Sequence, residues 1–266
     1  MAPELSWIDS HCHLDAVEFD ADRDQVVLVA RQAGVAGLVA PAVSADGFAK
    51  ARQVVARYPG CALALGLHPI YLDRHQPDDL WRLRAALQRG GVVAVGEIGL
   101  DGLVPGLDMA RQEALLVAQL QLAAEFGLPV LLHIRRAQDR VLKYLRAIRV
   151  PGGIAHAFNG SLQQAQAFIQ LGFRLGFGGA LTFERAQRIR ELARSVPLDS
   201  LVLETDAPDM SPSWCYRQRN SPAELPAIAA ALARLRDLPL PELAAATSAN
   251  LRAALRLPAD WPPPAG

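Results

Sequence analysis

The feature that most constrains the fold is a regular alternation of short apolar runs with longer amphipathic segments. The apolar runs are rich in Val, Leu, Ile and Gly and have the length of buried strands, whereas the intervening segments have helical periodicity. Near-continuous apolar strands separated by helices are typical of a parallel sheet covered by helices. The predicted strands are Leu5–Ile8, Val35–Val43, Ala62–Leu67, Val92–Ile98, Pro129–His133, Gly153–His156, Arg174–Gly178 and Leu201–Glu204.

The segment Asp108–Phe126 shows the helical signal most clearly. Asp108 is a candidate N-cap, the apolar residues that follow fall near one face, and Gly127 closes the segment before a strand that begins with proline. A final helical layer is predicted over 222–257, with a break at Pro239 and Pro241.

The number of strand–helix units chooses between two parallel-sheet architectures. Eight units in 266 residues favour a closed (β/α)8 TIM barrel. An open, doubly wound sheet is the competing arrangement. We treat residues 1–266 as one domain in this prediction.

Composition excludes several other classes of protein. With 51% hydrophobic and 20% charged residues the chain is an ordinary globular sequence. No apolar run approaches the ~18 residues of a membrane span. No basic, hydrophobic signal precedes the first strand, so a cytoplasmic protein is expected. Three cysteines at unrelated spacings form neither a disulfide framework nor a zinc cluster. A net charge of zero argues against coating nucleic acid electrostatically, but it is compatible with a nuclease that contacts few phosphates.

Metal-competent side chains follow six of the predicted strands. In barrels of this kind the chemistry lies at the carboxyl ends of the strands. Alone, such a histidine is more often a hydrogen-bonded core residue, but a shared rim of histidines and carboxylates is costly unless a cation neutralises it. Five of the six histidines belong to this set and only His75 does not. The residues are His11, His13, His68, Glu97, His133, His156, Glu204 and Asp206.

The spacing of the first pair also suits a metal ion. In an extended segment residues i and i+2 point to the same side, so His11 and His13 can bind one ion together. Imidazole and carboxylate ligands suit Zn, Mn, Fe or Mg, and the sequence does not choose among them.

These residues lie in blocks that resemble the TatD-type metal-dependent hydrolases of the amidohydrolase-like superfamily. The resemblance runs in order over residues 7–252. It implies a barrel with two divalent metal ions and an activity as a deoxyribonuclease. The blocks are Ile8–Asp15, Gly66–Pro69, Val95–Asp101, Leu128–His133, Gly153–Ser161 and Leu203–Pro208.

The resemblance also implies roles for the individual residues. It gives the first metal to His11, His13 and Asp206, the second to His133 and His156, and makes Glu97 a bridge between them. It places His68, Arg135 and Glu204 at the substrate or behind the ligands. Three features depart from the family pattern. Arg136 stands where many members have an acidic residue, the stretch Gly102–Leu107 lacks the aromatic residues common there, and the loop Ser211–Arg219 is individual.

Two ions about 3.5–4 Å apart would lower the pKa of a bridging water and clamp the oxygens of the scissile centre. Asp206 is the candidate general base, with Glu97 as the other catalytic carboxylate. Arg135 or His68 could stabilise charge on a phosphoryl oxygen. Arg135, Arg136, Arg217 and Arg219 are expected to form a basic patch near the rim.

Three functional hypotheses compete. The first is phosphodiester hydrolysis of DNA, as a 3'-5' exonuclease-like enzyme that needs no protein partner or membrane. The second is hydrolysis of a C–N or C–O bond in a small molecule. Many enzymes of that second class bridge their metals with a carbamylated lysine. Here Glu97 ends the fourth strand, and neither Lys50 nor Lys143 follows a strand. These positions favour the first hypothesis. A non-catalytic binding barrel is disfavoured because every metal-binding residue of the family pattern is present.

Overall fold

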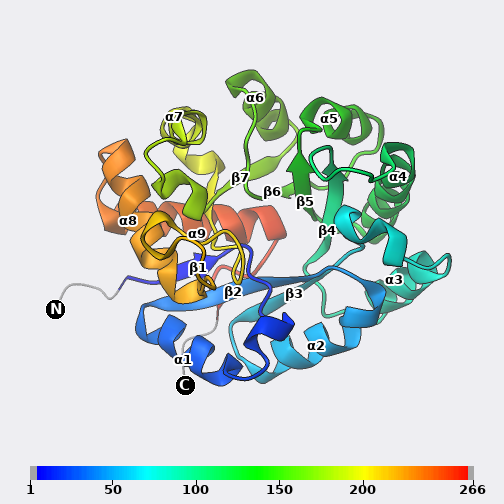
Figure 1. The fold of residues 1–266 in the computed structure, drawn as a ribbon, viewed down its shortest axis with the longest axis horizontal. Coiled ribbons are helices and arrows are strands. Elements are labelled where there is room, and N and C mark those ends of the chain that lie inside the picture. The colour runs from blue at the N-terminus through cyan, green and yellow to red at the C-terminus, as the bar shows by residue number, and fades with distance from the viewer. Residues whose placement is uncertain (1–4, 263–266) are drawn as a thin grey trace.

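The computed structural model describes residues 5–262 and confirms the parallel eight-stranded barrel (Figure 1). The order of the strands in the sheet follows the chain, and each strand pairs in parallel with the next. An open, doubly wound sheet would have a different strand order. The strands are β1 (Trp7–Asp9), β2 (Val35–Ala42), β3 (Cys61–Leu65), β4 (Ala94–Asp101), β5 (Val130–Arg135), β6 (Gly153–Ala155), β7 (Phe173–Phe177) and β8 (Leu201–Leu203).

Helices surround the sheet and include the predicted final layer. In α4 the Asp108 carboxylate accepts from the backbone N–H groups of residues 110 and 111, and Gly127 ends the helix in the left-handed conformation, as predicted. Pro239 precedes α9 and Pro241 lies in its first turn, which accounts for the break. The helices are α1 (Arg23–Gln32), α2 (Phe48–Arg57), α3 (Asp79–Gln88), α4 (Met109–Phe126), α5 (Gln138–Ala147), α6 (Leu162–Gln170), α7 (Gln187–Ser195), α8 (Leu225–Arg236) and α9 (Leu240–Leu255).

The barrel closes between β8 and β1 largely through residues beyond the strand ends. The N–H of Ser10 donates to Leu203 at 2.9 Å, and the N–H of Asp206 donates to His11 at 2.8 Å. Cys12 and Ala207 form a parallel bridge. The segments that carry the predicted first-metal residues are therefore also the segments that close the barrel.

The interior of the barrel is apolar below the candidate site. One or two small or branched residues from each of seven strands form a buried cluster with Leu251, Ala254 and Leu255 of α9. Helix α9 thus covers the end of the barrel opposite the candidate site. The strand residues in this cluster are Ile8, Val39, Ala62, Ala64, Ala94, Leu131, Ile154 and Val202.

Strand alternation carries this interior face up to the site. His133, His156 and Glu204 each come two residues after an interior apolar residue of the same strand, so their side chains point to the barrel axis. In β4 the alternation is interrupted, because Val95 and Ile98 both pack in the outer core and the register against β5 shifts between them. This irregularity turns Glu97, between the two, toward the axis.

All eight strands differ from the predicted bounds by one to three residues at one or both ends, and two of these differences bear on the barrel and the site. β4 continues past Ile98 to Asp101, because its last residues pair with His133–Arg135 of β5. β1 begins at Trp7 instead of Leu5, where pairing with Val35 starts. The longer β4 brings Asp101 to the same rim as the predicted ligands.

Two further expectations concern the membrane and the cysteines. None of the helices between residues 5 and 262 is both long enough and apolar enough to cross a membrane. The three cysteines are free thiols, and Cys12 is fully buried.

Candidate metal centre

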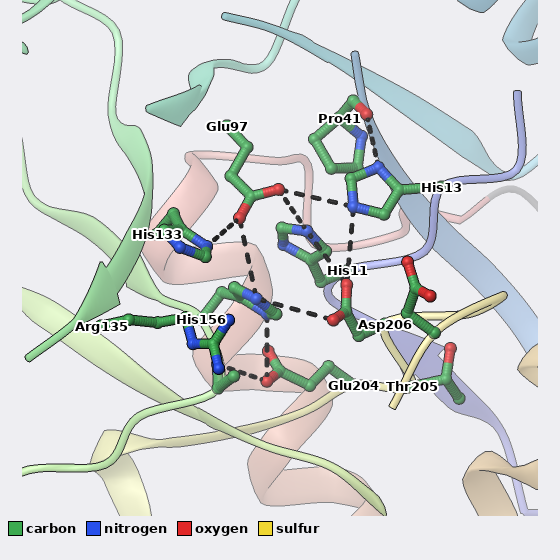
Figure 2. Close-up of polar contacts among 12 residues, drawn as sticks. His11, His13, Pro41, Glu97, His133, Arg135, His156, Glu204, Thr205 and Asp206 are labelled. Atoms are coloured by element: carbon green, nitrogen blue, oxygen red, sulfur yellow. Dashed lines mark hydrogen bonds and ion pairs between the residues drawn. The ribbon is translucent and has the colours of Figure 1, made fainter. Parts of the chain in front are cut away.

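Glu97 is the centre of the polar cluster at the carboxyl ends of the strands (Figure 2). Its side chain is buried and its two oxygens face different histidines. Oε2 lies 3.1 Å from His11 Nε2 and 3.4 Å from His13 Nε2. Oε1 lies 3.1 Å from His133 Nδ1 and 3.7 Å from His156 Nε2. One carboxylate therefore joins two groups of imidazoles.

Asp206 is the second carboxylate of the cluster. Its Oδ1 lies 3.7 Å from His11 Nε2 and 3.5 Å from His13 Nε2. Its Oδ2 lies 3.8 Å from His156 Nε2, so the side chain contacts both groups. Asp206 lies three residues beyond the end of β8, and its backbone has a φ of 58°.

Three of the histidines have an oxygen behind the ring nitrogen that faces away from the carboxylates. His13 Nδ1 donates to the carbonyl of Pro41 at 3.1 Å. His133 Nε2 donates to Asp101 Oδ2 at 2.9 Å, and His156 Nδ1 lies 3.3 Å from Glu204 Oε1. Such partners fix the tautomer of metal-binding histidines and leave the inner nitrogen as an electron-pair donor.

His68 has the opposite arrangement. Its Nδ1 accepts from the N–H of Ile70 at 3.1 Å, so in the neutral ring the proton is on Nε2. That Nε2 faces Glu97 Oε1 at 3.1 Å and is a donor to it. His68 therefore supports the shared carboxylate.

The histidines around Glu97 and Asp206 favour the ionised state of these two carboxylates. Burial opposes ionisation of Glu97, but the histidines around it hold its pKa well below the usual value. Burial would lower the pKa of His156, yet Asp206 and Glu204 raise it to about 10. Burial dominates at His68, whose pKa falls to about 4. The site therefore favours carboxylates that are ionised and can bind a cation.

The frame of the cluster is built from buried hydrogen bonds. Asp9 Oδ1 accepts from the N–H of His11 at 3.1 Å and from the N–H of Thr205 at 3.0 Å. It thereby fixes the two segments that present His11 and Asp206. Burial is the main reason why the pKa of Asp9 rises to about 7.

Glu204 is held in a slot beside β7. Its Oε1 accepts from the N–H of Ala157 at 2.6 Å. A Cβ on Gly176 would lie 2.0 Å from Glu204 Oε2, so only glycine leaves room for this buried carboxylate. The slot directs Glu204 toward His156.

The predicted arginines are distributed differently from the predicted ligands. Arg135 follows His133 on β5, is half exposed, and has one guanidinium nitrogen 3.7 Å from Asp101 Oδ2. Arg136 is exposed. Arg219 was expected in a basic patch, but both of its terminal nitrogens bind Asp22, at 2.8 and 2.6 Å. It therefore braces the loop, whereas Arg217 pairs with no carboxylate among residues 5–262.

Sequence reasoning missed three supporting groups: Asp101, the carbonyl of Pro41, and His75. The signal for Asp101 was available, because it lies four residues after Glu97 and hence on the same side of an extended strand. His75 contacts the carbonyl of His68 at 2.9 Å through Nε2. No sequence pattern indicates the contacts of Pro41 and His75. The first joins β2 to the segment that follows β1, and the second depends on how the segment after β3 folds.

The donor set fits divalent cations. Its nitrogen and oxygen atoms converge from the ends of six strands, are largely buried, and include ionised carboxylates that no lysine or arginine among residues 5–262 pairs at close range. In each of three groups the potential ligand atoms lie within 4.8 Å of one another. The groups are His11 with His13 and Asp206, His11 with Glu97 and His156, and His68 with Glu97 and His133.

The fold and the site define a class: (β/α)8 barrels with a histidine–carboxylate centre at the carboxyl ends of the strands. The sequence model described as "TatD related DNase" matches residues 8–256. The chain belongs to this TatD-related DNase family.

Individual relatives agree with the assignment. An uncharacterized metal-dependent hydrolase of Escherichia coli K12, YjjV, is 41% identical over 255 residues, which cover 95% of this chain and 98% of the relative. The crystal structure of that TatD homologue superposes with a TM-score of 0.92. The 3'-5' ssDNA/RNA exonuclease TatD of Klebsiella pneumoniae is 36% identical over 92% of this chain and 95% of the relative.

Proposed function

We propose that this protein is a two-metal phosphodiesterase that cleaves single-stranded DNA from the 3' end. The observation that carries the proposal is Glu97, whose two oxygens are divided between His11 and His13 on one side and His133 and His156 on the other. A carboxylate in this position is suited to bridge two cations.

His11, His13 and Asp206 would hold the first ion, and His133 and His156 the second. The outer contacts of His13, His133 and His156 support this choice, since they leave the inner nitrogens free to bind. His68 is not assigned as a ligand, because its inner nitrogen carries the proton. Zn, Mn and Mg are the candidate metals.

Bound divalent ions would supply Lewis acidity toward a phosphoryl oxygen and lower the pKa of a water molecule. The chain's own residues supply the remaining functions. Asp206 presents a carboxylate oxygen that can accept the proton of the attacking water. His68 donates to Glu97 and keeps it oriented. Arg135, half exposed at the rim, offers a guanidinium whose geometry matches a phosphate group.

The substrate class rests on chemistry and on the relatives together. A paired-cation site neutralises phosphodiester charge, and the relative from K. pneumoniae is named as an exonuclease on single-stranded DNA and RNA. The small-molecule alternative, hydrolysis of C–N or C–O bonds, is disfavoured by the position of the lysines. Lys50 lies in α2 and Lys143 in α5, so neither can bridge metals at the end of β4.

The test is a cleavage assay on purified protein that has been stripped of metal and reconstituted with Mn, Zn or Mg. We expect a 5'-labelled single-stranded oligonucleotide to shorten progressively from its 3' end only after reconstitution. Asp206→Asn should abolish the shortening, whereas Asp108→Asn, at the exposed start of α4, should not affect it. Reconstituted protein that is inert on phosphodiesters yet hydrolyses amides or lactones would establish the alternative.

A further inference from the structure

A cleft of about 750 Å³ lies beside the proposed metal centre, between the loops that follow β7 and β8. This volume is within the ~300–1,000 Å³ typical of ligand sites. The turn after Asp206 links the cleft to the centre: Pro208 and Asp209 line the cleft, and the N–H of Asp209 donates to the carbonyl of Asp206 at 2.9 Å. Other lining residues are Phe183 and Arg185 from the β7 loop, Tyr216 and Arg217 from the β8 loop, and Glu18.

The walls of the cleft are well braced. The two loops are in close contact, since a Cβ on Gly179 would lie 2.3 Å from the carbonyl oxygen of Met210. The N–H of Ser213 donates to Thr182 Oγ1 at 2.8 Å. The far end of the β8 loop is fastened by Arg219, which binds Asp22 with both terminal nitrogens. A loop held at both ends presents a preformed surface to a ligand.

Two aromatic rings and two guanidinium groups form the distinctive part of this surface. The rings of Phe183 and Tyr216 have centroids 5.6 Å apart at 80°, and Tyr216 is 52% exposed. The guanidinium of Arg217 lies 5.3 Å from the Tyr216 centroid, and that of Arg185 lies 5.7 Å from the Phe183 centroid. Neither arginine has an ion-pair partner among residues 5–262. Flat aromatic and guanidinium faces next to each other are the surfaces on which nucleobases stack.

The charged residues that line the cleft indicate that it suits nucleobases better than phosphate groups. Arg185 and Arg217 are balanced in number by Glu18 and Asp209, and Arg219 is neutralised by Asp22. The cleft therefore lacks the excess positive charge of a groove that follows a phosphate backbone. Its flat apolar faces with a few polar edges suit nucleobases instead.

We infer that this cleft binds the bases of a single-stranded nucleic acid by stacking on Tyr216 and Phe183, while the phosphodiester backbone lies at the metal centre. The inference rests on the proposed function and adds to it a base-binding subsite built from the individual loop Ser211–Arg219. It makes substrate affinity depend on the bases, although cleavage occurs in the backbone.

The experiment separates stacking from cleavage by measuring binding in a chelator, where no hydrolysis occurs. Fluorescence anisotropy would compare a labelled single-stranded oligonucleotide with an abasic strand of equal length and charge. We expect wild-type protein to prefer the strand with bases by about 5- to 150-fold, the range for one stacked base. Tyr216→Ala should remove most of this preference and Tyr216→Phe should retain it. A 2-aminopurine base in the strand should lose fluorescence on binding to wild-type protein and not to Tyr216→Ala.

Trp81→Ala is the matched control, because Trp81 is a 72% exposed aromatic residue on α3 outside the cleft. It should leave the preference unchanged, and equal melting temperatures would show that all variants are folded. Equal affinity of wild-type protein for both strands would overturn the inference, as would an unchanged preference in Tyr216→Ala. If these results accompany metal-dependent cleavage of DNA, the proposed function stands without the subsite. Base-dependent binding without cleavage by the reconstituted protein would instead refute the nuclease and retain the subsite.

Discussion

Asp101→Asn tests whether the outer contacts of the histidines control metal binding. Asp101 is buried, and its Oδ1 accepts from the N–H groups of Leu103 at 2.7 Å and Val104 at 2.9 Å. In the variant these two donors require the amide oxygen of Asn on their side. The amide NH2 group must then face His133 Nε2, where Oδ2 accepts at 2.9 Å in the wild type.

Two donors cannot face each other, so His133 must move its proton to Nδ1, the nitrogen directed at Glu97. The ring would then offer no electron pair to the second ion. Loss of such an outer partner typically weakens metal binding about 10- to 100-fold, which corresponds to about 1.4–2.8 kcal/mol. The first ion, held by His11, His13 and Asp206, should keep its affinity.

Calorimetric titration of metal-stripped protein would measure the two affinities separately. Asp108→Asn is the control, because Asp108 also accepts from two backbone N–H groups but lies at the exposed start of α4. Asn and Asp stabilise a helix about equally at its N-cap, where Asp108 lies. Wild-type affinity for both ions in Asp101→Asn would refute the assignment of His133 Nδ1 as a ligand atom. Equal weakening of both sites would refute the proposal that Asp101 supports only the second ion.

Three further predictions concern pH, packing and substrate. The pKa of His156 is raised from 6.5 to about 10, so its stabilising contribution is complete below pH 6.5 and is lost as pH rises to about 10. The free energy of unfolding of metal-free protein should therefore fall over that range. An equal decline in His156→Gln would show that His156 is not the cause. Gly176→Ala should lower the free energy of unfolding by about 1–3 kcal/mol and Tm by several degrees, because its Cβ would overlap Glu204. Gly47→Ala should not, because a Cβ at Gly47 would meet only Ser44 Oγ, at 3.6 Å; equal Tm values for the two variants would disprove the slot. Arg135→Ala should raise KM for an oligonucleotide about 10-fold with kcat nearly unchanged, since a charge-assisted phosphate contact is lost; a loss confined to kcat would argue against a binding role.

The sequence predicted the barrel and its rim well for a physical reason. Apolar strands and alternation are local properties, and alternation continues into His133, His156 and Glu204 at the strand ends. All the predicted ligands consequently lie in one cluster, although their roles as ligands stay predictions.

The remaining features depend on contacts between distant segments. The shift of register in β4 that turns Glu97 inward arises from its pairing with β5 and leaves no mark in the local pattern. The proton position of His68 depends on the N–H of Ile70 in a tight turn. Arg219 was expected to meet phosphate, but pairing with Asp22, 197 residues away, binds its guanidinium. The cleft between the β7 and β8 loops likewise exists only once both loops pack together.

The most direct test of two ions that share Glu97 is the metal content per chain after reconstitution with Mn or Zn and removal of free metal. Elemental analysis by mass spectrometry would compare wild-type protein, Glu97→Gln and His156→Ala. We predict two ions per wild-type chain, about one in His156→Ala, and reduced occupancy of both sites in Glu97→Gln, because Oε1 and Oε2 face different groups of histidines. One ion or none in the wild type, or a single full site in Glu97→Gln, would contradict the shared carboxylate.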